Sequence, residues 1–322
     1  LGASQIMRFT IFIAACVAAV TEGFVLATSP SSSLATPPLQ ATKKVVVTGA
    51  GGKTGQLLFE KLLSDAAYEP VGVVRSTKKA ALLKKKYGAS DSQVVIGDIS
   101  ADASSSEWTA VSESLEGAEI LCVVTSAVPV LLKRSLTKMM FRKLTRREVG
   151  RPEFKWSTPT GTPENVDYEG QVKQFDAAVA AGVKKIVVCS SMGGTQDDNF
   201  LNTIGKQEDG SGGDILKWKR KAEKYLLTLP VSHAIVHPGG LTNKPAASRR
   251  LVCDVNDALL DRKKRSIFRG DVAAVMLKAI ATEGNQVFDV ISEETEGGNE
   301  GCDMSPYDSF VEKGEKVYAY EG

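Results

Sequence analysis

Short apolar runs rich in Val and Ile alternate along the chain with longer segments in which apolar residues recur at helical spacing. The short runs predict β-strands. They lie at about residues 44–48, 70–75, 93–97, 119–125, 184–190, 232–237 and 287–290. The intervening segments predict helices, among them 56–63 and 271–281, and the acidic tail is expected to hold a short helix near 306–312. This alternation predicts an α/β fold with a doubly wound parallel sheet.

The first 41 residues have a different composition. Met7-Arg8 precedes an apolar run from Phe9 to Val20, which is too short to cross a bilayer but has the length of a signal-peptide core. The segment from 24 to 40 is rich in Ser, Thr, Ala and Pro and has no acidic residue, which is typical of a transit peptide. We therefore expect a presequence at residues 1–41 and a single domain at residues 42–322. The order of the two signals resembles the bipartite plastid presequence of algae with secondary red plastids, and secretion is the alternative.

Composition narrows the class of protein. The 322 residues are 43% hydrophobic and 24% charged with a net charge of +2, which suits one large α/β domain and does not indicate nucleic-acid binding. The five cysteines are widely spaced without a metal-binding pattern, and the two histidines are His233 and His237. Cys122 and Cys189 lie inside apolar runs, so we expect buried free thiols in a reducing compartment and no metal site.

The stretch VVVTGAGGKTG at residues 45–55 carries the first candidate chemistry. A triphosphate-binding P-loop would need a glycine five positions before Gly52, and that position is Val47. Strand, glycine turn and apolar helix instead follow in the order of a dinucleotide site, where the pyrophosphate meets a helix N-terminus. We expect the loop to bind the cofactor through Gly49, Gly52, Lys53, Thr54 and Gly55.

The second strand ends at Arg75, where an NAD site would usually carry Asp or Glu for the ribose 2′-hydroxyl. A guanidinium can pair bidentately with a 2′-phosphate, and Lys78 and Lys79 add positive potential, so the pattern favours NADP(H). A solvated basic turn is the alternative. The ends of the later strands supply further candidates for the cofactor site, namely Asp98, Ile99, Thr125 and Ser126.

Several motifs together resemble a known family. They are TGAGGKTG, GDIS, TSAVP, GRPEF, DYEGQVKQFDAA, AGVKKIVVCSSMGGT, ILKWKRKAEKYL and HPGGLTNK, spread from Lys43 to Val290. This combination resembles the plant and algal group of atypical short-chain dehydrogenase/reductases, relatives of NmrA-like NADP-binding proteins. The resemblance implies a Rossmann fold that binds NADP(H), with Pro238 among the cofactor contacts and a small C-terminal lobe over the nicotinamide end.

The resemblance leaves the catalytic set incomplete. Lys219 matches the lysine of the Tyr-x-x-x-Lys pair that extended family members use for proton transfer, but the tyrosine position is Ile215. Ser191 matches the family's serine. Tyr168 is a candidate substitute for the missing phenol, with packing or substrate contact as the alternative role, whereas Tyr225 is expected to face elsewhere. Otherwise Lys219 only binds ribose hydroxyls, and the proton comes from Ser191, water or no donor.

Two classes of function therefore remain open. The first is a reductase or isomerase acting on a small carbonyl compound or plastid metabolite, and the second is a non-catalytic NADP(H)-binding module for redox sensing or assembly. His237 stands where relatives commonly carry arginine, so we expect a charge to be lost there near neutral pH.

The segment 133–155 is basic and amphipathic, with nine Lys or Arg against two Glu. Its interleaved Leu, Met and Phe residues indicate a lid, a contact for an anionic substrate, or an attachment to an anionic surface or a protein partner. A solvated basic face is the alternative. Too few aromatic residues accompany the charges for nucleic-acid binding to be expected.

Overall fold

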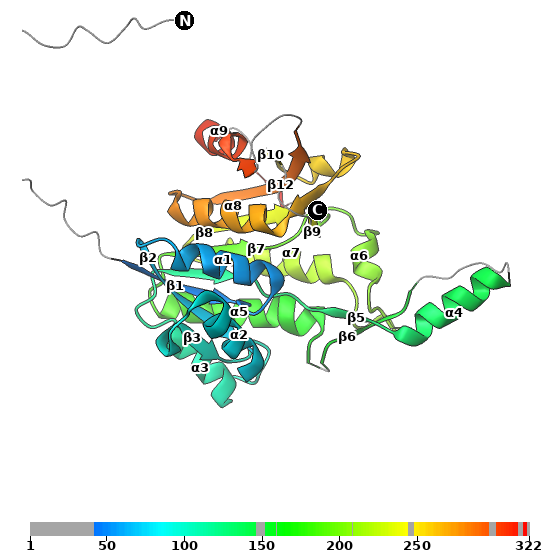
Figure 1. Cartoon of the computed structure of the whole chain (residues 1–322), viewed down its shortest axis with the longest axis horizontal. Helices are drawn as coiled ribbons and strands as arrows, with labels where there is room; N and C mark the ends of the chain where they lie inside the picture. The colour runs from blue at the N-terminus through cyan, green and yellow to red at the C-terminus, as the bar shows by residue number, and fades with distance from the viewer. Residues whose placement is uncertain are drawn as a thin grey trace, which may run out of the picture. The chain divides into compact units, whose positions relative to one another are not determined.

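The computed structural model describes residues 42–145, 152–158, 160–207, 209–243, 248–295, 301–314 and 318–320 (Figure 1). Contacts divide the chain into two units, Leu1–Leu39 and Gln40–Gly322. The expected presequence and residues 146–151 of the basic segment lie outside the described residues. Among the described residues, the first buried hydrophobic residue is Val45. The chain from residue 42 therefore contains all of the described core.

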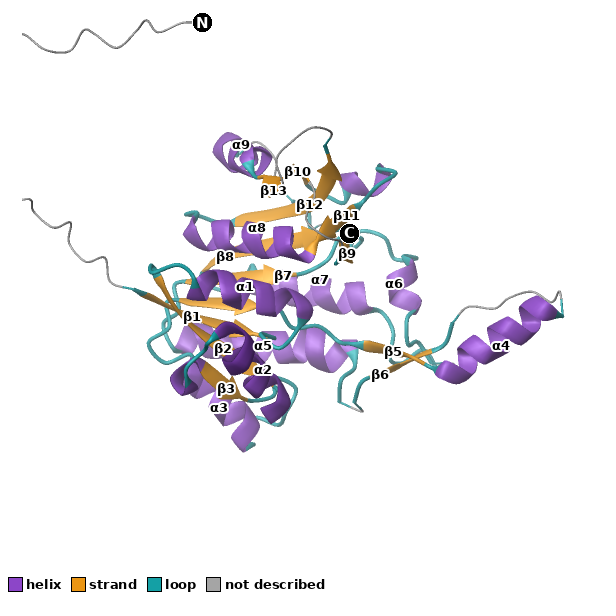
Figure 2. Ribbon diagram, in the orientation of Figure 1, coloured by secondary structure: helices purple, strands orange, loops and turns teal. Residues whose placement is uncertain are grey.

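A nine-stranded sheet forms the centre of the larger unit, in the order β13-β10-β12-β8-β7-β4-β1-β2-β3 (Figure 2). Seven strands are parallel: β1 (Lys43–Thr48), β2 (Tyr68–Val74), β3 (Val94–Ile96), β4 (Ile120–Val123), β7 (Lys185–Cys189), β8 (Ser232–Pro238) and β12 (Gln286–Glu294). The predicted doubly wound sheet is confirmed. The pattern did not predict β10 (Ser248–Asp254), which is antiparallel to β12, or β13 (Gly301–Asp303), which pairs with β10.

Helices cover both faces of the sheet, and alternate residues of β1 show why. Val45 and Val47 belong to the cluster that packs under α1 (Lys53–Leu63), α2 (Thr77–Tyr87) and α8 (Arg269–Ala281). Val46 belongs to the opposite cluster, under α3 (Ser106–Ser114), α5 (Gly170–Ala180) and α7 (Ile215–Leu226). Successive side chains of a strand point to opposite faces, so a strand buried on both faces is apolar throughout.

Several smaller elements lie outside this sheet. Two short ribbons are formed by β5 (Pro129–Leu131) with β6 (Phe154–Trp156), and by β9 (Gly240–Thr242) with β11 (Ser266–Phe268). The helix α4 (Lys133–Leu144) follows β5, and α6 (Phe200–Thr203) and α9 (Ser305–Lys313) complete the α-helices described. The single turns are η1 (Asp91–Gln93), the π-helical η2 (Glu164–Glu169) and η3 (Ala258–Asp261).

Candidate functional site

A cavity of about 970 Å³ lies at the carboxyl ends of the parallel strands. Its walls come from the glycine loop after β1, from the ends of β2, β3, β4 and β7, and from α7 and the two ribbons. The expected cofactor residues that line it are Gly49, Gly52, Lys53, Thr54, Gly55, Arg75, Asp98, Ile99, Thr125, Ser126 and Lys219. Pro238 is the exception, because it is buried in β8 and is absent from the cavity wall. The strand-end position agrees with the general rule for ligands of open α/β sheets.

The glycine loop is shaped for close approach of a ligand. Gly49 has a φ of +75°, and a Cβ atom there would lie 2.6 Å from the carbonyl oxygen of Val124. A Cβ on Gly55 would lie 2.2 Å from the carbonyl oxygen of Gly49, so only glycine allows α1 to begin this close to the loop. No side chain caps the N-terminus of α1 and no acidic residue lies in its first turn. Its free N–H groups therefore face the cavity as an anion site.

One end of the cavity suits the adenosine part of a dinucleotide. Arg75 is exposed at the cavity wall directly after β2, beside Ser76 and Lys79. The hydroxyl of Ser76 accepts a hydrogen bond from the backbone N–H of Lys79 and so caps α2. Asp98 accepts two hydrogen bonds from Ser100 through one carboxylate oxygen, which leaves the other oxygen for a ligand amino group.

The middle of the cavity contains an unsatisfied polar atom. The hydroxyl of Thr125 is buried without a hydrogen-bond partner, next to Ser126 at the end of β4. Buried hydroxyls are normally paired, so this one indicates a ligand contact. Together with the glycine cradle, it shows that the residues present fit a dinucleotide.

At the other end, the lining residue Lys219 belongs to a buried ion pair. Lys219 in α7 lies 2.7 Å from Asp167, and their side chains are 7% and 0% exposed. The second carboxylate oxygen of Asp167 accepts a hydrogen bond from the backbone N–H of Ala127 at 2.9 Å. Asp167 belongs to the π-helical turn η2, and it thereby fixes the lysine against the chain that leaves β4. The sequence analysis missed this carboxylate.

The residues expected to share a proton with Lys219 have different positions. Ser191 lines the cavity, and its hydroxyl donates only to the neighbouring carbonyl of Met192 at 3.1 Å. Ile215 occupies the tyrosine position and contributes an apolar wall. Tyr168 does not line the cavity, because its ring packs against Trp218 at 5.7 Å and under the ammonium of Lys221 at 4.1 Å. The structure therefore does not bring Tyr168 to Lys219 and Ser191.

Behind the strand ends, a buried polar network joins α7 to β7, β8 and β12. Glu223, one turn after Lys219, accepts a hydrogen bond from Ser190, and it lies 3.1 Å from both His237 and Arg220. The other ring nitrogen of His237 lies 3.3 Å from Asp289. Burial alone would lower the pKa of His237, but Glu223 and Asp289 raise it to about 9.

This charge corrects the expectation for His237. The imidazole is protonated at neutral pH and fully buried, and it faces two carboxylates instead of the cavity. Burial would raise the pKa of Glu223, yet His237 and Arg220 lower it to about 2. The position keeps a positive charge, and that charge pairs with two buried carboxylates instead of facing the cavity.

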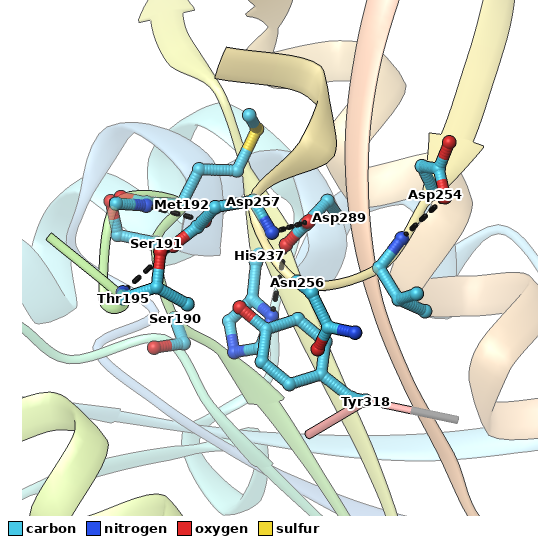
Figure 3. A network of polar contacts seen from close by, with 12 residues as sticks. Ser190, Ser191, Met192, Thr195, His237, Asp254, Asn256, Asp257, Asp289 and Tyr318 are labelled. Atoms are coloured by element: carbon cyan, nitrogen blue, oxygen red, sulfur yellow. Dashed lines mark hydrogen bonds and ion pairs between the residues drawn. The ribbon is translucent and has the colours of Figure 1, made fainter. Parts of the chain in front are cut away.

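The network extends to the loop after β7 and to the C-terminal tail (Figure 3). Asp257, at a φ of +60°, accepts hydrogen bonds from the backbone N–H groups of Gly193 and Thr195. Its own N–H donates to Asp289. The ring of Tyr318 packs on His237 at an interplanar angle of 53°, with centroids 4.6 Å apart. The buried carboxylate of Asp257 thus holds the loop that carries Ser191, and Asp289 in turn binds the backbone of Asp257.

Cys189 and Cys122 are free and buried, as expected. Cys189 also lines the cavity, but burial raises the pKa of its thiol to about 11, so it is not a nucleophile there at neutral pH. Within the described ranges no cluster of His, Cys, Asp or Glu could hold a metal ion. No helix of this part of the chain has the length and apolar character needed to cross a membrane.

Comparison with known proteins shows the family of the chain. The profile of the NAD(P)H-binding family matches residues 49–283, which include the glycine loop, Lys219 and Ser191. The chain belongs to this family. The resemblance of the sequence to plant short-chain dehydrogenase/reductases is confirmed by relatives from plants.

Two relatives and one solved structure illustrate the relationship. An uncharacterized chloroplastic protein of Arabidopsis thaliana is 39% identical over 254 residues, which cover 79% of this chain and 69% of the relative. The sanguinarine reductase of Eschscholzia californica is 36% identical over 256 residues, or 76% of this chain and 88% of the enzyme. A candidate NAD-dependent epimerase/dehydratase of Bacillus halodurans shares the fold, with a TM-score of 0.56 and 22% identity over 79% of this chain and 95% of that chain.

Proposed function

We propose that this protein is an NADP(H)-dependent reductase of a small organic substrate. The observation that carries the proposal is the continuity of the cavity, which extends from Arg75 and the glycine loop, past Lys219 and Ser191, to a wall of apolar side chains. That wall contains Trp156, Leu201, Ile204, Ile215, Leu216 and Leu241. Ligand sites of this kind combine an apolar lining with a few convergent polar groups.

Arg75 supports the choice of NADP(H) over NAD(H). Its guanidinium stands at the end of β2, where a carboxylate would otherwise meet the ribose 2′-hydroxyl, and Lys79 lines the same part of the cavity. A 2′-phosphate would pair with both cations.

When bound, the reduced nicotinamide supplies a hydride. Lys219, held by Asp167, would bind the ribose hydroxyls through its remaining N–H groups. The hydroxyl of Ser191 would donate to the substrate oxygen and so stabilise the charge that develops as hydride arrives. The apolar wall with Ile215 would limit the access of water to this point. With no phenol beside Lys219, the proton would come from Ser191 or from water at the cavity mouth.

The reductase of Eschscholzia californica supports this class of reaction, because its identity to this chain covers nearly the whole length of that enzyme. The second candidate is a non-catalytic NADP(H)-binding module. The specific observation in its favour is that Ile215 replaces the phenol while the cofactor half of the cavity is complete.

The test uses the chain from residue 42. NADPH binding is followed by its fluorescence, and NADPH oxidation is then followed by absorbance with a panel of quinones, aldehydes and isoprenoid carbonyl compounds. A reductase should oxidise NADPH with at least one compound, and Ser191→Ala should lower kcat by about tenfold or more with little change in NADPH affinity. Saturable NADPH binding with no oxidation by any compound would overturn the reductase proposal and favour the binding module.

We also propose that the protein acts in a plastid. The chloroplastic relatives and the order of the signals in residues 1–41 support this location. A fluorescent protein fused to residues 1–41 should enter plastids of an alga with secondary red plastids. Export of the fusion to the medium would instead establish secretion.

A further inference from the structure

The helix α4 forms a surface outside the cavity, because none of its residues lines the cavity wall. Of its 12 residues, five are Lys or Arg and none is acidic. In Figure 1 the helix lies beyond the β5–β6 ribbon, away from the nine-stranded sheet. Its first turn is tied to the ribbon, because the hydroxyl of Ser135 accepts a hydrogen bond from the backbone N–H of Glu153 at 2.8 Å. The N–H of Leu132 also donates to the carbonyl of Glu153 at 3.0 Å.

The rest of α4 presents large apolar side chains to solvent. Met140 is 72% exposed, Phe141 64% and Leu144 82%, and Leu136 is also exposed. Leu136, Met140 and Leu144 recur every four residues and therefore form one stripe along the helix. Soluble domains do not usually leave such a stripe uncovered.

Basic residues occupy the other side of this helix. At about 100° per residue, Arg134 and Arg142 fall on the side opposite the line from Leu136 to Leu144, and Lys143 falls beside that line. A helix that lies in a bilayer surface buries its apolar side in the acyl boundary, while its long basic side chains reach the lipid headgroups. An apolar groove on a protein would match the stripe alone, whereas a bilayer that contains anionic lipids matches both the stripe and the basic residues.

We propose that α4 docks the protein on a bilayer surface that contains anionic lipids. The exposed residues Val130 and Leu131 of β5 continue the apolar surface toward the cavity. Val128, Pro129 and Trp156 of the same ribbon region line the cavity itself. Docking through α4 would therefore bring the rim of the cavity close to the lipid surface. The docking does not depend on which reaction the cavity supports.

The test is cosedimentation of the chain from residue 42 with vesicles of phosphatidylcholine alone or with one third phosphatidylglycerol. We expect binding to the mixed vesicles, weaker binding at high salt and little binding to phosphatidylcholine. Replacement of the stripe by Met140→Ser with Leu144→Ser, or of charge by Arg142→Gln with Lys143→Gln, should each weaken binding by about tenfold or more. Each variant should bind NADPH like the unmodified chain, since none of these residues lines the cavity.

A matched control exists on α2, whose last turn also carries adjacent lysines. Lys85→Gln with Lys86→Gln removes the same charge from a helix end that has no exposed apolar stripe, and it should leave vesicle binding within about twofold. Equal losses in this control and in the α4 charge variant would overturn the proposal, because binding would then follow net charge alone. Absence of binding to the mixed vesicles would also overturn it. So would self-association that is abolished by the stripe variant, since a second copy of the chain would then cover the stripe.

Discussion

Asp167→Asn tests whether the buried ion pair organises the site. Asp167 forms an ion pair with Lys219 through one oxygen and accepts a hydrogen bond from the N–H of Ala127 through the other. Asparagine has the same shape but only one oxygen, so its amide group must face one of these two donors. The variant also leaves the ammonium of Lys219 buried without a countercharge. Breaking a buried pair in this way costs about 3–5 kcal/mol of folding free energy.

The assay is urea unfolding of the chain from residue 42, followed by circular dichroism. A matched control is Asp214→Asn, which breaks the partly exposed pair with Lys206 at 3.0 Å and should cost less than about 1 kcal/mol. Combining Asp167→Asn with Lys219→Met removes the unpaired charge, so the double variant should cost at least about 2 kcal/mol less than the sum of the two single variants. Additive costs, or an Asp167→Asn cost no larger than that of the control, would refute the argument that the two side chains act as a unit.

Two further predictions concern the cofactor and pH. Arg75→Asp should weaken NADPH binding by about thirtyfold or more and leave NADH binding unchanged or stronger. The variant replaces the partner of the 2′-phosphate by a partner of the 2′-hydroxyl. Unchanged NADPH affinity in a fluorescence titration would contradict the assignment of Arg75. Folding raises the pKa of His237 from about 6.5 to about 9, so stability from its protonation is complete below about pH 6.5 and is lost as the pH rises through 9. The difference in unfolding free energy between the native chain and His237→Gln should therefore shrink by about 3 kcal/mol between pH 6 and pH 9.5, and a difference that does not change with pH would sink this reasoning.

The sequence predicted the parallel core well, because each strand buried on both faces reads as a continuous apolar run. β1 is the clearest case, since Val45, Val46 and Val47 pack into two different clusters. The glycine loop was predictable for a related reason, namely that Gly49 and Gly55 are required by backbone contacts within the loop itself. The short strands β5, β6 and β9 were not predicted, because none of them is a run of Val and Ile residues such as β3.

The partners of charged residues could not be read from the sequence either. Asp167 and Lys219 are 52 positions apart, as the difference of their residue numbers shows, and only the packing of η2 against α7 brings them together. His237 was expected to be neutral because its partners, Glu223 and Asp289, come from distant elements. The sequence did indicate that Glu223 lies near the site. It comes four residues after Lys219, which places the two side chains on neighbouring turns of the same helix.

The two halves of the cavity are built from different parts of the fold. The glycine loop and the strand ends, which are fixed by the central sheet, form the cofactor half with their main-chain groups and with side chains such as Arg75 and Thr125. Side chains on short elements outside the sheet form much of the far wall, among them Trp156 on β6, Leu201 on α6 and Leu241 on β9. Substitutions at these three positions can alter the shape and polarity of the wall without disturbing the sheet or the loop. Related proteins can thus differ in the shape of this wall through a few short elements, and a designer can reshape it by changing these side chains while the central sheet stays intact.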